Sequence, residues 1–80
     1  MHPPTPTRRQ LDVLRALAAG TASGLLPSEI EIGRWVGLGR SRVHVLLVAL
    51  EDRGLICHRP GEHRTAVLTA VGREALLAAA

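Results

Sequence analysis

Residues 37–54 read GLGRSRVHVLLVALEDRG, a segment whose two ends carry the signals that begin and end a helix. Gly39 is an acceptable N-cap, and Gly54 follows the cation Arg53 where a helix should stop. The apolar residues between these glycines recur with the period of a helix that lies on a core, and they are Val43, Leu46, Leu47 and Leu50. We therefore predict a packed helix that starts close to residue 40.

The first turn of this helix carries positive charge where a helix tolerates it least. Arg40 and Arg42 oppose the helix dipole by about 0.3–1 kcal/mol each, and His44 follows them. Helix propensity does not explain these residues, whereas a polyanion bound at this helix end would. The alternative is that they form an ordinary solvated helix face.

The composition predicts one small domain with an aliphatic core. Hydrophobic residues make up 46% of the 80 residues, but Trp35 is the only aromatic one, and we expect it in the core. A chain of this length buries only about 60–65% of its unfolded surface. All 10 basic residues are arginine and the formal net charge is +3, a mild basic bias that is compatible with nucleic acid. Arginine suits bidentate phosphate and guanine contacts, although a GC-rich genome also explains the absence of lysine.

Several other classes of protein are not favoured. Cys57 is the only cysteine, so an intramolecular disulfide is excluded. No apolar run approaches the roughly 18 residues of a membrane span, and the N-terminus lacks a signal-peptide core, so we expect a cytoplasmic protein. Cys57, His58 and His63 do not have the spacing of a zinc site. The acidic residues pair with no evident nucleophile or base, so we expect no metal, no cofactor and no enzymatic activity.

An extended arm and a capped helix are predicted at the start of the chain. Residues 1–6 hold three of the five prolines and should form a flexible arm, which places the folded domain at residues 7–80. Thr7 and Gln10 fit a capping box, and the helix that they begin should end at Gly20. Its apolar stripe is expected to be Leu11, Leu14, Leu17 and Ala18.

A second capped helix is predicted before residue 37. Ser28 and Glu31 fit another capping box, and Gly37 can close this helix in the left-handed conformation. The side chains expected to face inward are Ile32, Trp35 and Val36. Because only a tight turn separates this helix from the next one, the two helices are a candidate helix-turn-helix.

A β-hairpin and a last helix are predicted in the final third of the chain. Residues 55–59 and 65–69 have strand character, and the turn-rich residues 60–64 separate them. Thr69 can cap a helix that runs to about Ala78. The predicted order is helix-helix-helix-strand-strand-helix, a mainly α fold with a small β-hairpin, which is the winged helix-turn-helix.

An ordered set of short motifs, spread over residues 7–77, resembles two known families. The first part of the set comprises Thr7, Arg8, Arg9, Gln10, Val13, Leu14, Pro27, Ser28, Glu31 and Ile32. The middle part comprises Gly37, Leu38, Arg40, Ser41, Val43, Leu47, residues 49–51 and residues 53–56. The last part comprises Arg59, Pro60, residues 62–64, residues 66–69, Gly72 and Arg73. The first part is similar to the DNA-binding domain of LexA-type repressors, the middle part to both LexA-like and MarR-like winged helices, and the last part to MarR-like regulators.

The resemblance implies roles for particular residues in DNA binding. It places a recognition helix in the major groove, with contacts from Arg40, Ser41, Arg42, His44 and Val45. It implies a wing at the hairpin tip with Arg59, His63 and Arg64, of which Arg64 would enter the minor groove beside its acidic partner Glu62. Arg8, Arg9 and Ser28 are candidates for a phosphate clamp, although the two arginines could equally face solvent.

These features favour a small transcriptional regulator, most simply a repressor of bacterial or phage origin, that binds double-stranded DNA sequence-specifically. Both families dimerise through parts that we do not expect here, a protease domain or long terminal helices. We therefore predict a homodimer through the C-terminal helix, with Leu76 and Leu77 as the contacts. Val45 and Val48 could touch thymine methyl groups or a protein. The alternative function is a winged-helix protein-interaction module that docks on transcription machinery or on another regulator.

Overall fold

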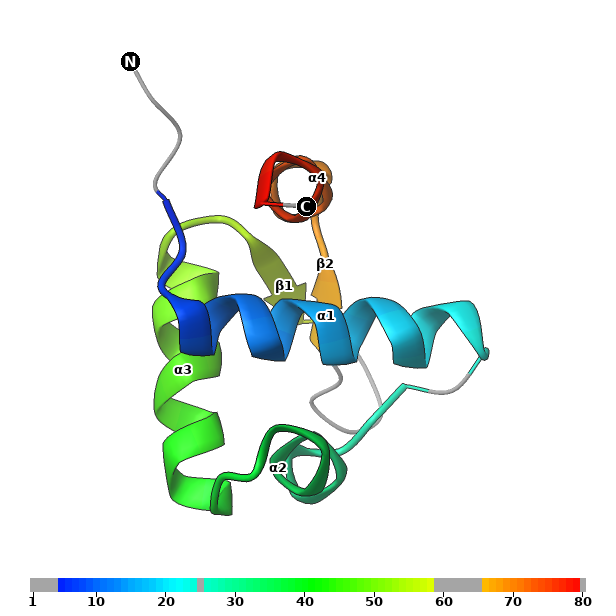
Figure 1. Cartoon of the computed structure of the whole chain (residues 1–80), viewed down its shortest axis with the longest axis vertical. Coiled ribbons are helices and arrows are strands. Elements are labelled where there is room, and N and C mark those ends of the chain that lie inside the picture. The colour runs from blue at the N-terminus through cyan, green and yellow to red at the C-terminus, as the bar shows by residue number, and fades with distance from the viewer. Residues whose placement is uncertain (1–4, 25, 59–65, 80) are drawn as a thin grey trace.

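The computed structural model describes residues 5–24, 26–58 and 66–79. Its helices and strands follow the predicted order (Figure 1). The elements are α1 (Arg8–Ala22), α2 (Glu29–Val36), α3 (Arg40–Asp52), β1 (Ile56–His58), β2 (Ala66–Leu68) and α4 (Ala70–Ala79). Three helices are thus followed by a two-stranded antiparallel hairpin and a final helix, so the predicted winged helix-turn-helix is confirmed.

Both predicted capping boxes are present. The Thr7 hydroxyl accepts from the Gln10 backbone N–H at 3.2 Å, and the Gln10 side chain accepts from the Thr7 N–H at 2.9 Å. The Ser28 hydroxyl and the Glu31 carboxylate make the same reciprocal pair at the start of α2, each at 3.2 Å. Because each box satisfies two backbone donors that a helix cannot satisfy by itself, the starts of α1 and α2 are defined locally.

The end of α1 differs from the prediction. Gly20 is buried inside the helix, which continues to Ala22. The hydroxyl of Thr21 donates to the Leu17 carbonyl at 2.9 Å, and the hydroxyl of Ser23 donates to the Gly20 carbonyl at 2.8 Å. Only the Ser23 hydroxyl satisfies a carbonyl of the last turn, and the helix passes through Gly20 and ends two residues later than expected.

The core lies where α1 crosses the other elements. In Figure 1, α1 lies across the centre of the molecule, where it contacts α2, α3, α4 and β2. The buried apolar side chains are Val13, Leu14, Ala16, Leu17, Ile32, Val43, Leu47, Leu50, Leu55, Ile56 and Ala66. The stripe predicted on α3 is therefore correct, with Leu46 at its partly buried edge. On α1 the predicted stripe is only partly correct, because Val13 and Ala16 are buried while Leu11 and Ala18 lie at the margin.

Trp35 is not in the core, contrary to the prediction. Its side chain is 55% exposed and lies beside Arg15 and Ala19 of α1. The inward face of α2 is centred on Ile32 and Gly33, and a Cβ at Gly33 would collide with the Leu38 carbonyl. Trp35 follows Gly33 by two residues, about 200° around the helix, and is therefore turned away from the core.

The hairpin and α4 complete the fold. Ile56 pairs with Leu68, Cys57 is exposed, and Leu55 and Thr69, which were predicted as strand residues, lie just outside β1 and β2. The Thr69 hydroxyl accepts from the Gly72 N–H at 3.1 Å and donates to the Gly54 carbonyl at 2.6 Å. Thr69 therefore caps α4, as predicted, and also ties it to the end of α3. No helix within the described residues has the length and apolar character that crossing a bilayer requires.

Candidate nucleic-acid interface

One face of α3 is exposed along its first two turns. Gly39 begins the helix without a side-chain cap, and Val43, Leu47 and Leu50 hold the opposite face in the core. All of the side chains predicted for the major groove are exposed, and they are Arg40, Ser41, Arg42, His44 and Val45. Arg40 and His44 lie on one side of this exposed part of α3 and Arg42 on the other, with Ser41 and Val45 between them, and we call the exposed part the α3 face. Their contact with DNA stays a prediction.

A carboxylate from α2 holds one side of the α3 face. Glu29 Oε2 lies 2.9 Å from His44 Nδ1, and Glu29 Oε1 lies 3.5 Å from Arg40 Nε. The side chain of Glu29 is 27% exposed, whereas those of Arg40 and His44 are 71% and 52% exposed, so both contacts lie at the surface. Sequence analysis did not identify Glu29. The sequence indicated that Glu29 lies in the first turn of α2. Because Glu29 and His44 are 15 residues apart in the chain, nothing in the sequence indicated that their side chains meet.

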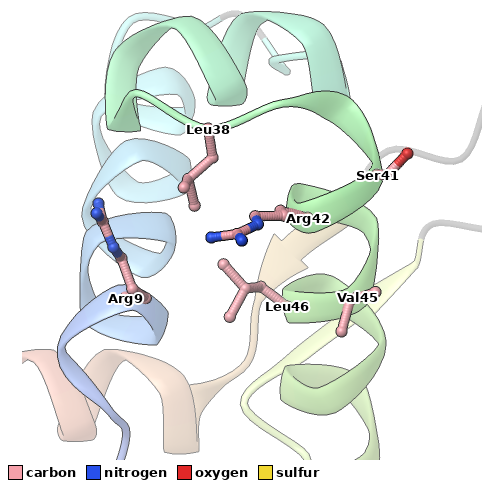
Figure 2. A pocket seen from close by; sticks show the side chains of 6 residues that line it. All are labelled: Arg9, Leu38, Ser41, Arg42, Val45 and Leu46. Atoms are coloured by element: carbon pink, nitrogen blue, oxygen red, sulfur yellow. The ribbon is translucent and has the colours of Figure 1, made fainter.

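The other side of the α3 face borders a hollow of about 330 Å³ between α1 and α3 (Figure 2). The guanidinium of Arg42 points into this hollow between Leu38 and Leu46, toward Arg9 of α1. Arg9 donates from Nη1 to the Val36 carbonyl at 3.3 Å and lies 3.9 Å from Asp12 Oδ2. No ion pair among the described residues involves Arg42. The hollow therefore combines apolar walls with two cationic groups.

The candidate phosphate-clamp residues do not form a single cluster. Arg9 lies beside the hollow, and Arg8 is exposed at the start of α1. Ser28 lies at the start of α2, next to Glu29 and thus on the other side of the α3 face. Its hydroxyl oxygen already accepts from Glu31. Any phosphate contacts from these residues would therefore flank α3 on two sides.

The predicted wing residues lie outside the described residues, and they are Arg59, Glu62, His63 and Arg64. The strands on either side of them, β1 and β2, are in place. His58 at the end of β1 pairs through Nδ1 with the carboxylate of Glu51 on α3. Within the described ranges, no group of three possible metal ligands comes together.

Comparison with known proteins agrees with this geometry. The family model described as "LexA DNA binding domain" matches residues 3–65. The crystal structure of the M. tuberculosis transcriptional regulator MosR is similar over 92% of this chain and 53% of that chain, with a TM-score of 0.77 and 26% sequence identity. The chain thus spans about half the length of MosR. No curated protein sequence matches this chain. The predicted resemblance to LexA-type and MarR-like regulators is confirmed.

Proposed function

The chain belongs to the LexA DNA-binding domain family, and on that premise we propose that it is a transcriptional regulator that reads a specific duplex with α3. That it is a DNA-binding winged helix-turn-helix domain follows from the family. The observation that carries the finer proposal is the α3 face. Val43 and Leu50 hold α3 in the core, while Arg40 and His44 are exposed on one side of the helix and Arg42 is exposed on the other.

In this proposal the α3 face lies in the major groove. The guanidinium of Arg42 can take guanine O6 and N7, and a bidentate contact of this kind discriminates by about 1–3 kcal/mol. Ser41 adds a hydrogen-bonding group, and Val45, which is 67% exposed, offers apolar contact to a thymine methyl group. Contacts outside the major groove would come from Arg8, Arg9 and Ser28 on phosphates, and from Arg59, His63 and Arg64 in the wing.

We further propose that the chain represses transcription as a homodimer joined through α4. Leu77 is 76% exposed and Val71, earlier in the same helix, is 42% exposed, whereas Leu76 packs on the core. A dimer would let two α3 helices occupy half-sites one helical turn apart, which multiplies the few contacts that one domain makes. A Leu77→Ser variant should then sediment as a monomer. A wild-type chain that is itself monomeric at high micromolar concentration would contradict the dimer.

A second candidate function is docking on another protein. Val48 is 44% exposed on α3, and the exposed Val45 lies three residues before it, so the two side chains are neighbours on the helix surface. Patches of this kind commonly mark contact with a protein. In that case the α3 face would bind transcription machinery or another regulator instead of DNA.

A salt titration of duplex binding separates these candidates. A preferred duplex is first selected from a randomised pool, and its affinity is compared with that of a scrambled duplex between about 50 and 200 mM salt. Phosphate contacts predict a steep loss of affinity, with a log–log slope close to −0.9 for each phosphate neutralised. A shallow slope with no preference for the selected duplex would contradict the proposal and favour protein docking.

A further inference from the structure

Glu29 lies where it can control what the α3 face reads. Among the described residues, it is the acidic residue that lies close to two of the proposed base-contacting side chains, 3.5 Å from Arg40 Nε and 2.9 Å from His44 Nδ1. We propose that Glu29 determines base specificity by fixing the orientation of Arg40 and the tautomer of His44. Glu29 thereby acts as a positioning residue. This inference rests on the proposed function.

The carboxylate of Glu29 is held in a defined place. Glu29 is the first residue of α2, directly after the N-cap Ser28, where the helix dipole favours negative charge. The capping box between Ser28 and Glu31 orders the same turn. Each carboxylate oxygen of Glu29 then faces a different partner on α3. A carboxylate anchored in this way can orient side chains on the neighbouring helix.

The contact with Glu29 specifies the tautomer of His44. An ionised carboxylate accepts hydrogen bonds but cannot donate them, so the proton must lie on His44 Nδ1, which is 2.9 Å from Glu29 Oε2. In the neutral ring, Nε2 is then an acceptor. The major-groove donors are the N4 amino group of cytosine and the N6 amino group of adenine. His44 would therefore read a cytosine or an adenine.

The same carboxylate orients Arg40. Arg40 Nε lies 3.5 Å from Glu29 Oε1, and an arginine held through Nε keeps its two terminal nitrogens available. Such a pair of donors matches guanine O6 and N7. Arg40 and His44 are four residues apart and share one side of α3. The preferred site should thus contain a guanine and a cytosine or adenine close to each other.

A base-substitution scan tests this inference. Every base pair of the selected duplex is replaced in turn, and binding is measured for the wild type, Glu29→Gln and the matched control Glu31→Gln. A His44→Ala variant identifies the position that His44 reads. The wild type should prefer cytosine or adenine there by about tenfold. In Glu29→Gln the preference should fall to about twofold or less, because an amide can donate as well as accept.

The Glu31→Gln control separates a change in base preference from the general effect of removing a negative charge. Both Gln variants remove one negative charge from the first turn of α2. Both should therefore bind scrambled DNA more tightly than the wild type does, and to the same extent. Glu31→Gln keeps its capping box, because Gln also serves at this position. It should keep the base preference. An unchanged base preference in Glu29→Gln, or an equal loss of base preference in both variants, would overturn this inference but not the proposed function. A wild type without any base preference would refute the proposed function as well.

A second measurement needs no DNA. Nitrogen NMR of the neutral His44 ring in the free chain should show the proton on Nδ1. In Glu29→Ala the ring loses its partner and should show the tautomer mixture of an unconstrained imidazole. The same mixture in the wild type would overturn the inference. Because a merely structural role for Glu29 would leave the tautomer unchanged, this readout reports the contact itself.

Discussion

Helices α1 and α3 have similar lengths, 15 and 13 residues, but opposite designs at their N-termini. α1 begins with a complete capping box between Thr7 and Gln10. α3 begins at Gly39, which makes no side-chain hydrogen bond, and continues with Arg40. The N-terminus of α1 is therefore capped from within the chain, whereas the N-terminus of α3 leaves its backbone donors uncapped beside Arg40, whose partner is Glu29 of α2.

The difference extends to the faces of the two helices. α1 buries Val13, Leu14 and Leu17 completely and contacts all three other helices. α3 buries a narrower stripe and keeps large apolar residues such as Val45 in solvent. In this fold α1 mainly stabilises the core, whereas α3 is less stabilised because its N-terminus is uncapped and the α3 face stays exposed. Changes in α1 should thus alter folding, and changes in α3 should alter recognition.

The largest effect is expected from Leu14→Ala in α1. Leu14 is fully buried, so the lost contacts and the resulting cavity should lower the free energy of unfolding by about 2–5 kcal/mol. Chemical denaturation followed by circular dichroism measures this loss. Val45→Ala in α3 is the matched control and should change stability by less than about 0.5 kcal/mol. Equal losses in the two variants would remove the distinction between the helices.

Arg42→Ala should have the opposite effect to Leu14→Ala, because it should weaken DNA recognition and leave stability almost unchanged. We expect binding to the preferred duplex to weaken by about 1–3 kcal/mol, with little change on scrambled DNA. Stability should hardly change, since no ion pair of Arg42 exists among the described residues. Fluorescence anisotropy with the two duplexes measures the difference. A similar loss on both duplexes would show that Arg42 touches only phosphate.

Thr7→Ala tests the cap of α1. The substitution leaves the Gln10 backbone N–H without its acceptor and should lower the free energy of unfolding by about 1 kcal/mol. The affinity of the folded chain for DNA should stay the same. Thermal unfolding and duplex binding, measured on the same sample, check both statements. A loss of affinity without a loss of stability would mean that Thr7 itself contacts DNA, next to the proposed phosphate contacts of Arg8 and Arg9.

Gly39→Ser supplies α3 with the cap that it lacks. Gly39 has φ −72° and ψ 161°, which serine adopts readily, and a Cβ there meets nothing within 4 Å. The free energy of unfolding should rise by a few tenths of a kcal/mol, roughly the difference between serine and glycine at an N-cap. Duplex affinity should fall slightly, because the new hydroxyl occupies a donor that phosphate would use. A gain in both quantities would mean that the N-terminus of α3 is not a phosphate site.

The starts of the helices could be predicted because their causes are local. Each capping box joins residues only three positions apart, so Thr7 with Gln10 and Ser28 with Glu31 are recognisable in the chain. The periodicity of α3 likewise separates Val43 from its exposed neighbours. Short stretches of sequence are thus sufficient to predict the order of the elements, the N-terminal caps of the helices and the exposed α3 face.

The contacts between elements depend on how the helices pack, and no local pattern predicts them. Gly33 allows the Leu38 carbonyl to approach α2 closely, and this packing helps to set the direction in which α2 faces the core. The resulting rotation of α2 exposes Trp35 and brings Glu29 to His44, 15 residues away. A side chain at one end of a short helix reaches a partner on another helix only for particular crossing geometries. For that reason the candidate recognition residues were identifiable from the chain, whereas the carboxylate that orients them emerged from the packing of α2 against α3.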